Sequence, residues 1–316
     1  MIWVAVDAMG GDFAPRHVVD GALAASRDFD LGVALVGQAA VLEGELARHG
    51  GVDASRVRIV DAPDVIQMDE SPAAALRRKP GASIKVAADI VTRGDASALF
   101  SAGHTGATVM AAHGAFGMLP GVDRPALAAT IPTRQRPAVM LDVGASVECR
   151  PQHLLQFAVM GSVYARVAFG IDAPRVGLLS IGAEATKGNE LTRDAHQLLK
   201  AAPLAFIGNI EARDVYSGQA DVIVCDGFTG NVALKISEGL VDMFKGLLSD
   251  AAWSRLDYAE YGGAPLLGLA GVAIVGHGRS SVKAVRNAVV MAHRFAAGRF
   301  IDRVEREIAA AAVPHP

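Results

Sequence analysis

The sequence predicts an α/β fold in which layers of helices cover a mostly parallel sheet. Short apolar runs rich in β-branched residues are each followed by a turn rich in glycine and aspartate, and then by a longer helical stretch. Near-continuous apolar strands of this kind are typical of a parallel sheet covered on both faces. We expect six such strands, at Ile2–Val6, Ala98–Phe100, Val139–Val143, Val176–Ser180, Val222–Cys225 and Val272–Val275.

Helical stretches separate these strands. A proline in the first turn favours a helix start at Pro15 and at Pro151. The expected helices are Pro15–Arg27, Pro151–Phe169, Lys187–Ala201, Ser281–Ala297 and Ile301–Ala312. There is no low-complexity linker, internal repeat or strong domain boundary in the sequence.

The composition excludes several classes of protein. With 316 residues, 51% of them hydrophobic and 20% charged, the chain has ample material for a core and is not intrinsically disordered. Thirty Lys and Arg residues against 33 Asp and Glu residues give a net charge of −3. Dedicated nucleic-acid-binding proteins carry an excess of basic residues, which this chain does not have, so no nucleic-acid partner is expected.

The sequence indicates neither a metal site nor a nucleotide cofactor. The 9 histidines show no paired metal-ligand spacing, and the two cysteines, Cys149 and Cys225, read as buried free thiols. The segment Gly182–Gly188 has its lysine before the glycine, so it is not a Walker loop, and Gly276–Ser281 lacks the third glycine of a dinucleotide turn. A Gly-x-Ser-x-Gly elbow is also absent.

The sequence predicts a cytoplasmic location. Its first residues read as a strand rather than a signal peptide, because they carry no basic region and reach Asp7 early. The longest uncharged stretch, Gly262–Gly276, is rich in glycine and shorter than the ~20 apolar residues of a membrane-spanning helix.

The turns after the strands predict a site for an anion. In open parallel sheets, ligands bind where strands end and loops enter helices. Glycine there lets backbone N–H groups approach an anion near a helix N-terminus. Any one turn is also explained as an ordinary tight turn, but several together favour a phosphate-bearing ligand. These turns contain Gly10, Gly11, Gly103, Gly106, Gly227, Gly230, Gly276 and Gly278.

Several polar residues stand beside these turns, and each has two interpretations. Lys187 is either an exposed first-turn lysine or a cation aimed at an anion or oxyanion. Asn231 is either a helix cap or a hydrogen-bond donor to the same oxygen. Arg124 could pair with phosphate or with Asp123, and His104 is either a turn residue or a ligand contact. We expect Asp7 and Asp12 to orient backbone and cationic groups rather than to transfer protons.

Seven motifs occur together and in order, and their combination resembles one family. They are Asp7-Ala-Met-Gly-Gly-Asp12, Ser101-Ala-Gly-x-Thr-Gly-Ala107, Arg124-Pro-Ala, Leu141-Asp-Val-Gly-Ala145, Thr186-Lys-Gly-Asn-Glu190, Asp226-Gly-Phe-Thr-Gly-Asn231 and Tyr261-Gly-Gly-Ala-Pro-Leu-Leu-Gly268. From residue 2 to about residue 300 the chain resembles the bacterial acyl-ACP:phosphate acyltransferases, which feed phospholipid synthesis.

The resemblance implies a reaction without a cofactor. An acyl group passes from acyl carrier protein (ACP) to inorganic phosphate, and a membrane glycerol-3-phosphate acyltransferase uses the acyl phosphate. The implied fold is a three-layer α/β/α arrangement like that of isocitrate and isopropylmalate dehydrogenases and phosphotransacetylases. Residues 1–316 would then form one acyltransferase domain with two lobes and an active site in the crevice at the strand ends. A homodimer is also implied.

The resemblance also assigns site residues. Lys187 and Asn231 would form the catalytic core, with His277 as a candidate proton donor to the departing sulfur. Substrate and phosphate contacts are expected from Asp7, Gly10, Gly11, Asp12, Ser101, Gly103, His104, Thr105, Gly106, Arg124, Asp142, Asn189, Glu190, Asp226, Gly227, Thr229 and Gly230. Because ACP is acidic, the basic run Arg77-Arg78-Lys79 is the candidate docking patch, although a solvated helix end explains it equally well.

The chain departs from the family pattern at a few places. His104 and Ser146 replace the asparagines expected there, and the acidic run at 183–185 is thinned to one glutamate. The stretch 238–261 is shorter than the segment that is thought to touch the membrane in relatives, which weakens the expectation of peripheral membrane contact. Its apolar face, explained equally well by a core or dimer role, contains Met243, Phe244, Leu247, Leu248 and Trp253.

Two other functions stay open at this point. A short-chain phosphotransacylase acting on CoA thioesters would use the same fold and the same anion-binding turns. A non-catalytic protein that binds acyl-ACP or phosphate would explain the altered turn residues.

Overall fold

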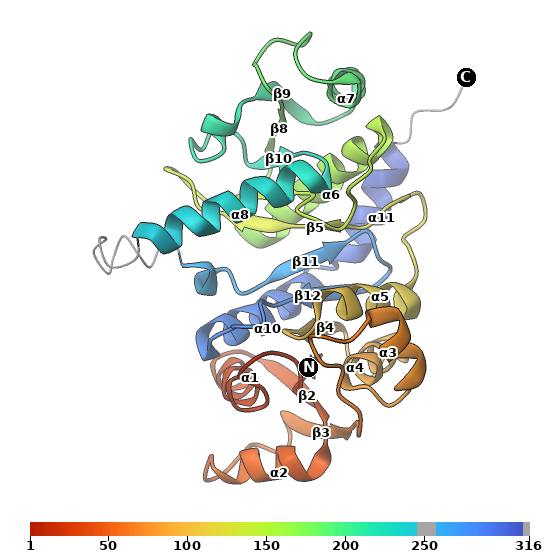
Figure 1. Cartoon of the computed structure of the whole chain (residues 1–316), viewed down its shortest axis with the longest axis vertical. Coiled ribbons are helices and arrows are strands. Elements are labelled where there is room, and N and C mark those ends of the chain that lie inside the picture. The colour runs from red at the N-terminus through yellow and green to blue at the C-terminus, as the bar shows by residue number, and fades with distance from the viewer. Residues whose placement is uncertain (245–256, 312–316) are drawn as a thin grey trace. The chain divides into compact units, whose positions relative to one another are not determined.

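The computed structural model describes residues 1–244 and 257–311. Contacts between Cα atoms divide the chain into two compact units, each assembled from separate pieces of sequence (Figure 1). The first unit comprises Met1–Gly117 and Tyr258–Gly298, and the second comprises Met118–Asp257 and Arg299–Pro316.

The first unit is built on a mostly parallel sheet with the strand order β3-β2-β1-β4-β12-β11. Only β11 runs antiparallel to its neighbour β12. All seven residues of β2 are buried, as expected for a strand covered on both faces. The strands are β1 (Ile2–Asp7), β2 (Leu31–Gly37), β3 (Val57–Asp61), β4 (Ala98–Ser101), β11 (Ala264–Leu267) and β12 (Val272–Val275).

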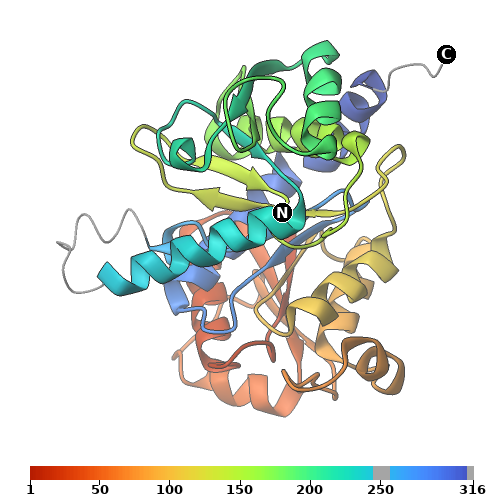
Figure 2. The ribbon, with the colours of Figure 1, turned by 45° about the horizontal axis from the view of Figure 1, so that its top comes forward.

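Helices pack on both faces of this sheet (Figures 1 and 2). Helices α1 and α10 pack against each other closely enough that a Cβ at Gly21 would lie 2.6 Å from the Val282 carbonyl oxygen. Helices α4 and α5 form a second packed pair. The helices of this unit are α1 (Arg16–Asp28), α2 (Ala39–Ala47), α3 (Pro72–Arg78), α4 (Ser83–Thr92), α5 (Thr105–Phe116), the short η2 (Tyr258–Glu260) and α10 (Val282–Ala297).

The second unit contains a five-stranded sheet with the order β6-β7-β10-β8-β9. The β6–β7 pair is antiparallel and the other pairs are parallel. The strands are β5 (Ala126–Leu127), which lies outside this sheet, β6 (Ala129–Ile131), β7 (Ala138–Leu141), β8 (Arg175–Leu179), β9 (Ala205–Ile210) and β10 (Val222–Val224).

Helix α6 forms the core of the second unit. Twelve of its residues are buried, and a Cβ at Gly161 would lie 2.5 Å from Val222 on the sheet. Helices α7 and α11 pack against α6. The helices of this unit are α6 (Pro151–Phe169), α7 (Glu190–Ala201), the short η1 (Ala212–Asp214), α8 (Gly227–Phe244) and α11 (Phe300–Ala311).

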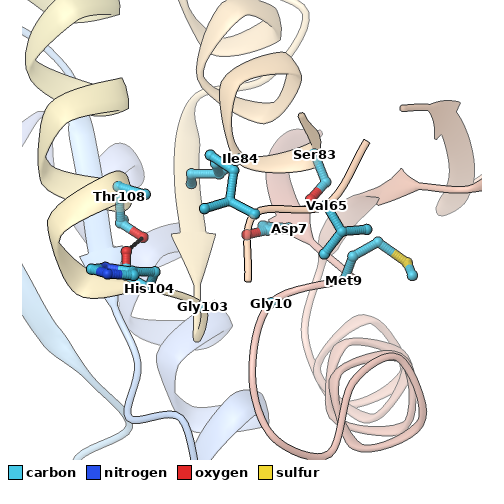
Figure 3. A pocket seen from close by; sticks show the side chains of 11 residues that line it. Asp7, Met9, Gly10, Val65, Ser83, Ile84, Gly103, His104 and Thr108 are labelled. Carbon is cyan, nitrogen blue, oxygen red and sulfur yellow. Dashed lines mark hydrogen bonds between the residues drawn. The ribbon is translucent and has the colours of Figure 1, made fainter. Parts of the chain in front are cut away.

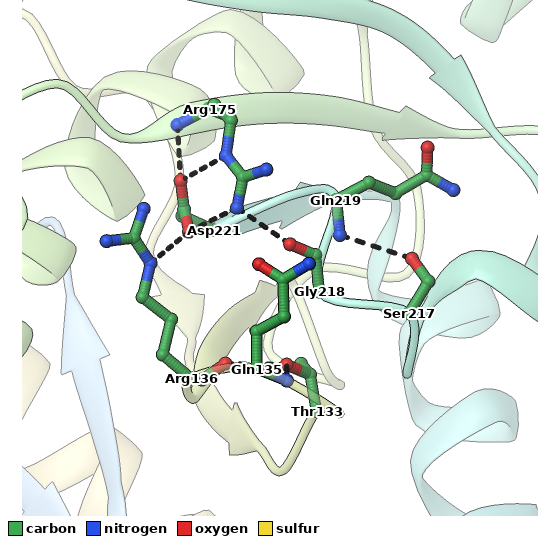
Figure 4. A network of polar contacts seen from close by, with 8 residues as sticks. All are labelled: Thr133, Gln135, Arg136, Arg175, Ser217, Gly218, Gln219 and Asp221. Carbon is green, nitrogen blue, oxygen red and sulfur yellow. Dashed lines mark hydrogen bonds and ion pairs between the residues drawn. The ribbon is translucent and has the colours of Figure 1, made fainter.

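An ion-pair cluster ties the amino ends of the second sheet together (Figure 4). The Asp221 carboxylate, whose side chain is 2% exposed, accepts hydrogen bonds from the backbone N–H of Arg175 and from both its Nε and Nη2. Arg136 Nε donates to the same carboxylate at 2.9 Å. The cluster therefore joins the start of β8, the residue before β10 and the β6–β7 turn.

The predicted α/β layering is confirmed, as are the six predicted strands within one to two residues at their ends. Helix Pro151–Phe169 matches its prediction, whereas the predicted start of the next helix at Lys187 is wrong, because α7 begins at Glu190. Cys225 is buried as expected, but Cys149 is only half-buried.

Candidate functional site

Three loops of the first unit meet at the carboxyl edge of its sheet. Asp7 and Val275 are both register partners of Ser101, so β1, β4 and β12 end side by side. The Asp12 N–H donates to the Gly278 carbonyl oxygen at 2.8 Å. We call residues 7–12, 101–106 and 276–278 the first-unit loop cluster. These three turns therefore lie side by side.

The Ser101 hydroxyl is the centre of this cluster. It donates to Asp7 Oδ2 at 2.7 Å and accepts from the Gly103 N–H at 3.1 Å and from Thr108 Oγ1 at 3.3 Å. Asp7 itself is 3% exposed. Burial raises the pKa of Asp7, and the hydroxyls of Ser83 and Ser101 oppose that effect.

The expectation that Asp7 orients a cationic group gains no support from the part of the chain that the structure describes. No Lys, Arg or His side chain there forms an ion pair with it. Asp12 is exposed, and its recorded contact is the backbone bond to Gly278.

Glycine is required where the loops of this cluster touch. A Cβ at Gly10 would lie 2.7 Å from both Asp7 Oδ2 and the Gly103 nitrogen, and Gly11 has φ +113°. Only glycine adopts such a φ at no steric cost. These glycines let the first loop lie directly against the second.

His104 caps helix α5. Its Nδ1 accepts a hydrogen bond from the Gly106 N–H at 3.1 Å, and its carbonyl oxygen accepts from Thr108 Oγ1. An imidazole nitrogen that accepts leaves the ring proton of the neutral form on Nε2. The histidine thus performs the capping role that an asparagine oxygen performs elsewhere. Thr105, the first residue of α5, is exposed.

A small pocket opens beside this helix start (Figure 3). The cavity has a volume of about 10 Å³, enough for roughly one water molecule. Its walls are Asp7, Met9, Gly10, Val65, Ile66, Ser83, Ile84, Gly103, His104, Ala107 and Thr108. Val65, Ile66, Ser83 and Ile84 were missed in the sequence, because they belong to no motif and reach the pocket from the segment after β3 and from α4.

His277 lies in the third loop of the cluster and is exposed. Its Nδ1 accepts a hydrogen bond from the Arg279 N–H at 3.1 Å, and its carbonyl oxygen accepts from the Ser280 hydroxyl. The structure thus gives His277 a role in shaping the turn, and its role as a proton donor stays a prediction.

Two loops of the second unit also meet at a sheet edge. Leu141 and Leu178 are both register partners of Val224, so β7, β8 and β10 end together. The Gly227 N–H donates to the Ser146 carbonyl oxygen at 2.9 Å. We call residues 142–146 and 226–231 the second-unit loop cluster.

Asp142 shapes this cluster from within. Its two carboxylate oxygens accept four backbone N–H groups, from Leu127, Gly144, Ala145 and Ser146. Burial raises its pKa, and these hydrogen bonds oppose the rise. Because Asp142 is fully buried and its oxygens are used by the backbone, the predicted contact with substrate gains no support.

The 226–230 turn does not cradle an anion in the way that its glycines suggest. The N–H groups of Gly227, Thr229 and Gly230 already donate within the protein, to Ser146, to the Asp226 carboxylate and to the Asp226 carbonyl oxygen. Asp226 also accepts from the Thr229 hydroxyl and so caps α8. A Cβ at Gly230 would lie 1.9 Å from the Asp142 carbonyl oxygen. These glycines therefore serve close packing, which corrects the expectation.

Asn231 lies in the second turn of α8 and is not its cap, which is a correction. Its side-chain Nδ2 donates to the Val143 carbonyl oxygen at 3.2 Å, and the residue is exposed. The amide oxygen has no recorded partner in residues 1–244 and 257–311. The side chain is thus held against the loop that follows β7.

Lys187 lies in the loop between β8 and α7, three residues before the helix begins. It is exposed, and its ammonium makes no hydrogen bond or ion pair with any described residue. Asn189 caps the helix by accepting the Thr192 N–H at 2.9 Å, and Glu190 is the first helical residue. Lys187 therefore lies before the helix and not in its first turn, where the helix dipole disfavours a cation.

Arg124 is exposed and forms no ion pair in the described part of the chain, Asp123 included. Its charge acts on the pKa of Cys149, beside the second-unit loop cluster. Burial raises the pKa of Cys149 to about 11 and that of Cys225 well above its usual value. Both thiols are therefore protonated at neutral pH and are poor nucleophiles.

The candidate docking patch is smaller than its sequence suggests. Lys79 Nζ is bound to Glu70 Oε2 at 2.5 Å and to the Val65 carbonyl oxygen at 2.7 Å. Arg77 and Arg78 are exposed at the end of α3, although Arg78 Nη2 also lies 3.8 Å from Glu70 Oε1. The inclusion of Lys79 in the patch is therefore corrected.

The apolar segment of the chain is only partly described. Met243 is 62% exposed and Phe244 is 44% exposed at the end of α8. Leu247, Leu248 and Trp253 lie outside the described residues.

Among the helices that are described, none has the length and hydropathy to span a membrane. Residues 1–244 and 257–311 contain no group of three His, Cys, Asp or Glu side chains placed to hold a metal ion.

Comparisons with known proteins identify the family. The model of the family described as "Fatty acid synthesis protein" matches residues 2–303. The chain is 49% identical to a phosphate acyltransferase of Pelotomaculum thermopropionicum, over 96% of this chain and 94% of that one. It is 48% identical to a phosphate acyltransferase of Nitratidesulfovibrio vulgaris, over 97% and 95% of the two chains.

The fold is shared with more distant proteins. A phosphotransacetylase from Streptococcus pyogenes superposes with a TM-score of 0.69 at 18% identity, covering 94% of each chain. This likeness confirms the predicted phosphotransacetylase-like fold. Given the near-full-length match to its model, the chain belongs to the fatty acid synthesis protein family and, within it, to the phosphate acyltransferases.

Proposed function

We propose that the chain transfers a fatty acyl group from acyl-ACP to inorganic phosphate, forming acyl phosphate and free ACP. A phosphate oxygen attacks the thioester carbonyl carbon, a C–O bond forms, and the C–S bond breaks with its electrons going to sulfur. Phosphate is already an anionic nucleophile and a thiolate is a fair leaving group, so no covalent enzyme intermediate is needed. The poor nucleophilicity of both thiols and the full burial of the Ser101 hydroxyl agree with direct attack.

The observation that carries this proposal is the pocket at the start of α5 in a chain of this family. The pocket lies at a helix N-terminus, where N–H groups and the helix dipole favour a small anion. The first-unit loop cluster would thus hold phosphate.

Lys187 and Asn231 are assigned to the oxyanion. When phosphate attacks, negative charge develops on the thioester oxygen, and an ammonium and an amide N–H are suitable donors to it. Both residues are exposed, and Lys187 lies in the loop after β8 whereas Asn231 lies in helix α8 after β10, the neighbouring strand of the second sheet. His277 is the proposed proton donor to the departing sulfur.

The same proposal names partners. The acidic ACP would dock on the exposed guanidinium groups of Arg77 and Arg78, and a membrane glycerol-3-phosphate acyltransferase would consume the acyl phosphate. We further propose that the chain acts as a homodimer in the cytoplasm, with membrane contact limited to the shortened 238–261 segment.

The test is to incubate the chain with long-chain acyl-ACP and phosphate and to follow the release of ACP thiol. Acyl phosphate should be trapped by hydroxylamine in equal amount. A parallel reaction with acetyl-CoA separates this function from a short-chain phosphotransacylase, which would turn over acetyl-CoA faster. The absence of trapped product with either thioester would leave the non-catalytic binding protein as the better interpretation.

A further inference from the structure

A buried asparagine holds the loop that carries Lys187. Residues 183–187 are all exposed, and the Lys187 N–H donates to the Glu184 carbonyl oxygen at 3.0 Å, which closes a turn. The same carbonyl oxygen accepts a hydrogen bond from Asn209 Nδ2 at 2.9 Å. Asn209 lies near the end of β9 and is 7% exposed. The turn that ends at Lys187 is therefore attached to the second sheet through the Asn209 amide.

His196 determines which end of this amide faces the turn. Because Asn209 Nδ2 donates to Glu184, its Oδ1 is the atom that meets His196 Nδ1, 2.9 Å away. An amide oxygen only accepts hydrogen bonds, so His196 Nδ1 carries a proton and donates it. The His196 ring is buried and packs edge-on against Phe206, with the ring centroids 5.1 Å apart. The imidazole is thus held in place and keeps the NH₂ of Asn209 directed at the turn.

Other contacts restrict the loop but do not replace this amide. A Cβ at Gly182 would lie 2.9 Å from Lys187 Cγ, so the stem of the lysine lies close to the backbone at the start of the loop. Arg193 Nη1 donates to the Gly188 carbonyl oxygen at 2.9 Å, but Arg193 is exposed and its bond comes after Lys187. The bond from Asn209 therefore fixes the backbone that leads into Lys187.

We propose that Asn209 is a positioning residue for Lys187 and that His196 orients Asn209 for this role. An oxyanion donor stabilises a transition state only from hydrogen-bond distance of the atom on which charge develops. A misplacement of about 1 Å can lower a rate about 100-fold. Without its anchor, the exposed turn would spread the Lys187 ammonium over many positions. The inference rests on the proposed function for the catalytic role of Lys187, whereas the anchoring of the loop is independent of it.

The first experiment measures the anchoring without turnover. Trypsin cleaves after lysine and arginine, so cleavage of the exposed Lys187–Gly188 bond reports on opening of the loop. Cleavage after Arg93, which is exposed in the first unit, is the internal reference. Asn209→Leu keeps the side-chain size and removes the bond to Glu184. We expect cleavage after Lys187 to become about tenfold faster, with cleavage after Arg93 unchanged. Equal cleavage after Lys187 in the variant and the unaltered chain would overturn the inference.

Gln156→Leu is the matched control. Gln156 also belongs to the second unit, and its Nε2 donates to the carbonyl oxygen of another loop residue, Gly121, at 3.0 Å. Its loss removes a bond of the same kind, so cleavage after Lys187 should stay at the rate of the unaltered chain. Faster cleavage after Lys187 in Gln156→Leu would show that the effect is not specific to Asn209.

Two substitutions of His196 test the orientation of the amide. His196→Ala leaves Asn209 free to turn and should speed cleavage after Lys187. In His196→Asn, an amide nitrogen occupies nearly the position of Nδ1 and can donate to Asn209 Oδ1, so cleavage should be slow again. Equally fast cleavage in both variants would refute the role of His196. If Asn209→Leu does not fold, this pair of variants decides whether the amide anchors the loop.

The second experiment connects the anchor to the reaction through a double-mutant cycle. We expect Asn209→Leu to lower kcat for ACP thiol release about tenfold in the unaltered chain. It should have no further effect where Lys187 is already alanine, because the group that it positions is gone. A general loss of structure would lower kcat by the same factor in both backgrounds, and that result would refute the positioning role.

The two experiments separate this inference from the proposed function. Faster cleavage in Asn209→Leu together with a normal kcat for Lys187→Ala would contradict the proposed role of Lys187 and leave the anchoring of its loop established. A low kcat for Lys187→Ala with unchanged cleavage in Asn209→Leu would contradict only the role of Asn209.

Discussion

Asp7 and Ser101, 94 residues apart in sequence, are register partners on neighbouring strands and are joined by a hydrogen bond of 2.7 Å. This bond fixes the ends of β1 and β4 against each other. Ser101 is fully buried, so its hydroxyl is not placed to attack a substrate as a nucleophile. The pair thus positions the pocket instead of taking part in bond formation.

Replacement of Lys187 tests the proposed oxyanion contact. We expect Lys187→Ala to lower kcat by ~10²–10³-fold, because removing one oxyanion donor typically has that effect. The measurement is the initial rate of ACP thiol release at saturating phosphate. Lys200→Ala, which removes an exposed lysine from the last turn of α7, should leave kcat unchanged. A normal kcat for Lys187→Ala would remove its catalytic role.

Two glycines of α8 should respond in opposite ways to the same change. In Gly230→Ala the new Cβ would lie 1.9 Å from the Asp142 carbonyl oxygen, so the helix start must shift. We expect the free energy of unfolding to fall by about 3 kcal/mol. Nothing lies within 4 Å of a Cβ at Gly239, so Gly239→Ala should stabilise by about 0.5–1 kcal/mol. Urea unfolding of both variants measures this, and equal effects would refute the packing role of Gly230.

His104 caps α5 through its Nδ1, and the side-chain oxygen of an asparagine could accept the same hydrogen bond. His104→Asn should keep the free energy of unfolding within about 0.5 kcal/mol, since its oxygen can accept the same Gly106 N–H. His104→Ala leaves that N–H without its acceptor and should cost about 1 kcal/mol. Thermal unfolding of the two variants checks the difference. Equal stability of the alanine and asparagine variants would show that the cap contributes nothing.

The free energy of unfolding should depend on pH through the ion pairs of Asp221. Burial alone would raise the pKa of Asp221, but hydrogen bonds from Arg175 and Arg136 outweigh it and hold the pKa below its usual range. Its stabilising contribution is therefore complete above the unfolded-state value of about 3.9 and is lost as pH falls through the lower folded-state pKa.

Asp221→Asn should destabilise by about 3 kcal/mol at pH 7, at the low end for a broken buried pair because the arginines stay partly solvated. The difference should shrink in strong acid. Denaturant unfolding at both pH values measures it, with Asp95→Asn as the exposed control. A constant difference at all pH values would contradict the assignment.

Sequence patterns found several strands whose residues are uniformly apolar, although β2 (Leu31–Gly37), which is also uniformly apolar, was missed. Val272–Val275 is one example, because burial on both faces leaves no polar position to obscure the pattern. Strand β9 was missed because Gly208 and Asn209 interrupt it, and Asn209 is there to bind His196 and the Glu184 carbonyl oxygen. The predicted helix start at Lys187 was wrong because Asn189, whose side chain accepts the Thr192 N–H, is the N-cap of α7.

The site was predictable only where polar residues end adjacent strands. Asp7 and Ser101 were found because both follow apolar runs in motifs. Ser83 and Ile84 reach the same pocket through the packing of α4, which no local pattern encodes. The glycines at 227 and 230 look in sequence like an anion cradle, and only the occupied N–H groups reveal that they serve close packing.

The division of the chain into interleaved pieces has a consequence for biosynthesis. Strand β12 pairs with β4 inside the first sheet, yet it follows nearly the whole second unit in sequence. On the ribosome, the nascent chain therefore leaves that edge of β4 uncovered until Val275 has been translated and has emerged. An uncovered strand edge can pair with strands of other chains. Slow translation between residues 118 and 271 would lengthen the time for which β4 is uncovered, and a chaperone that binds the nascent chain would then reduce aggregation most.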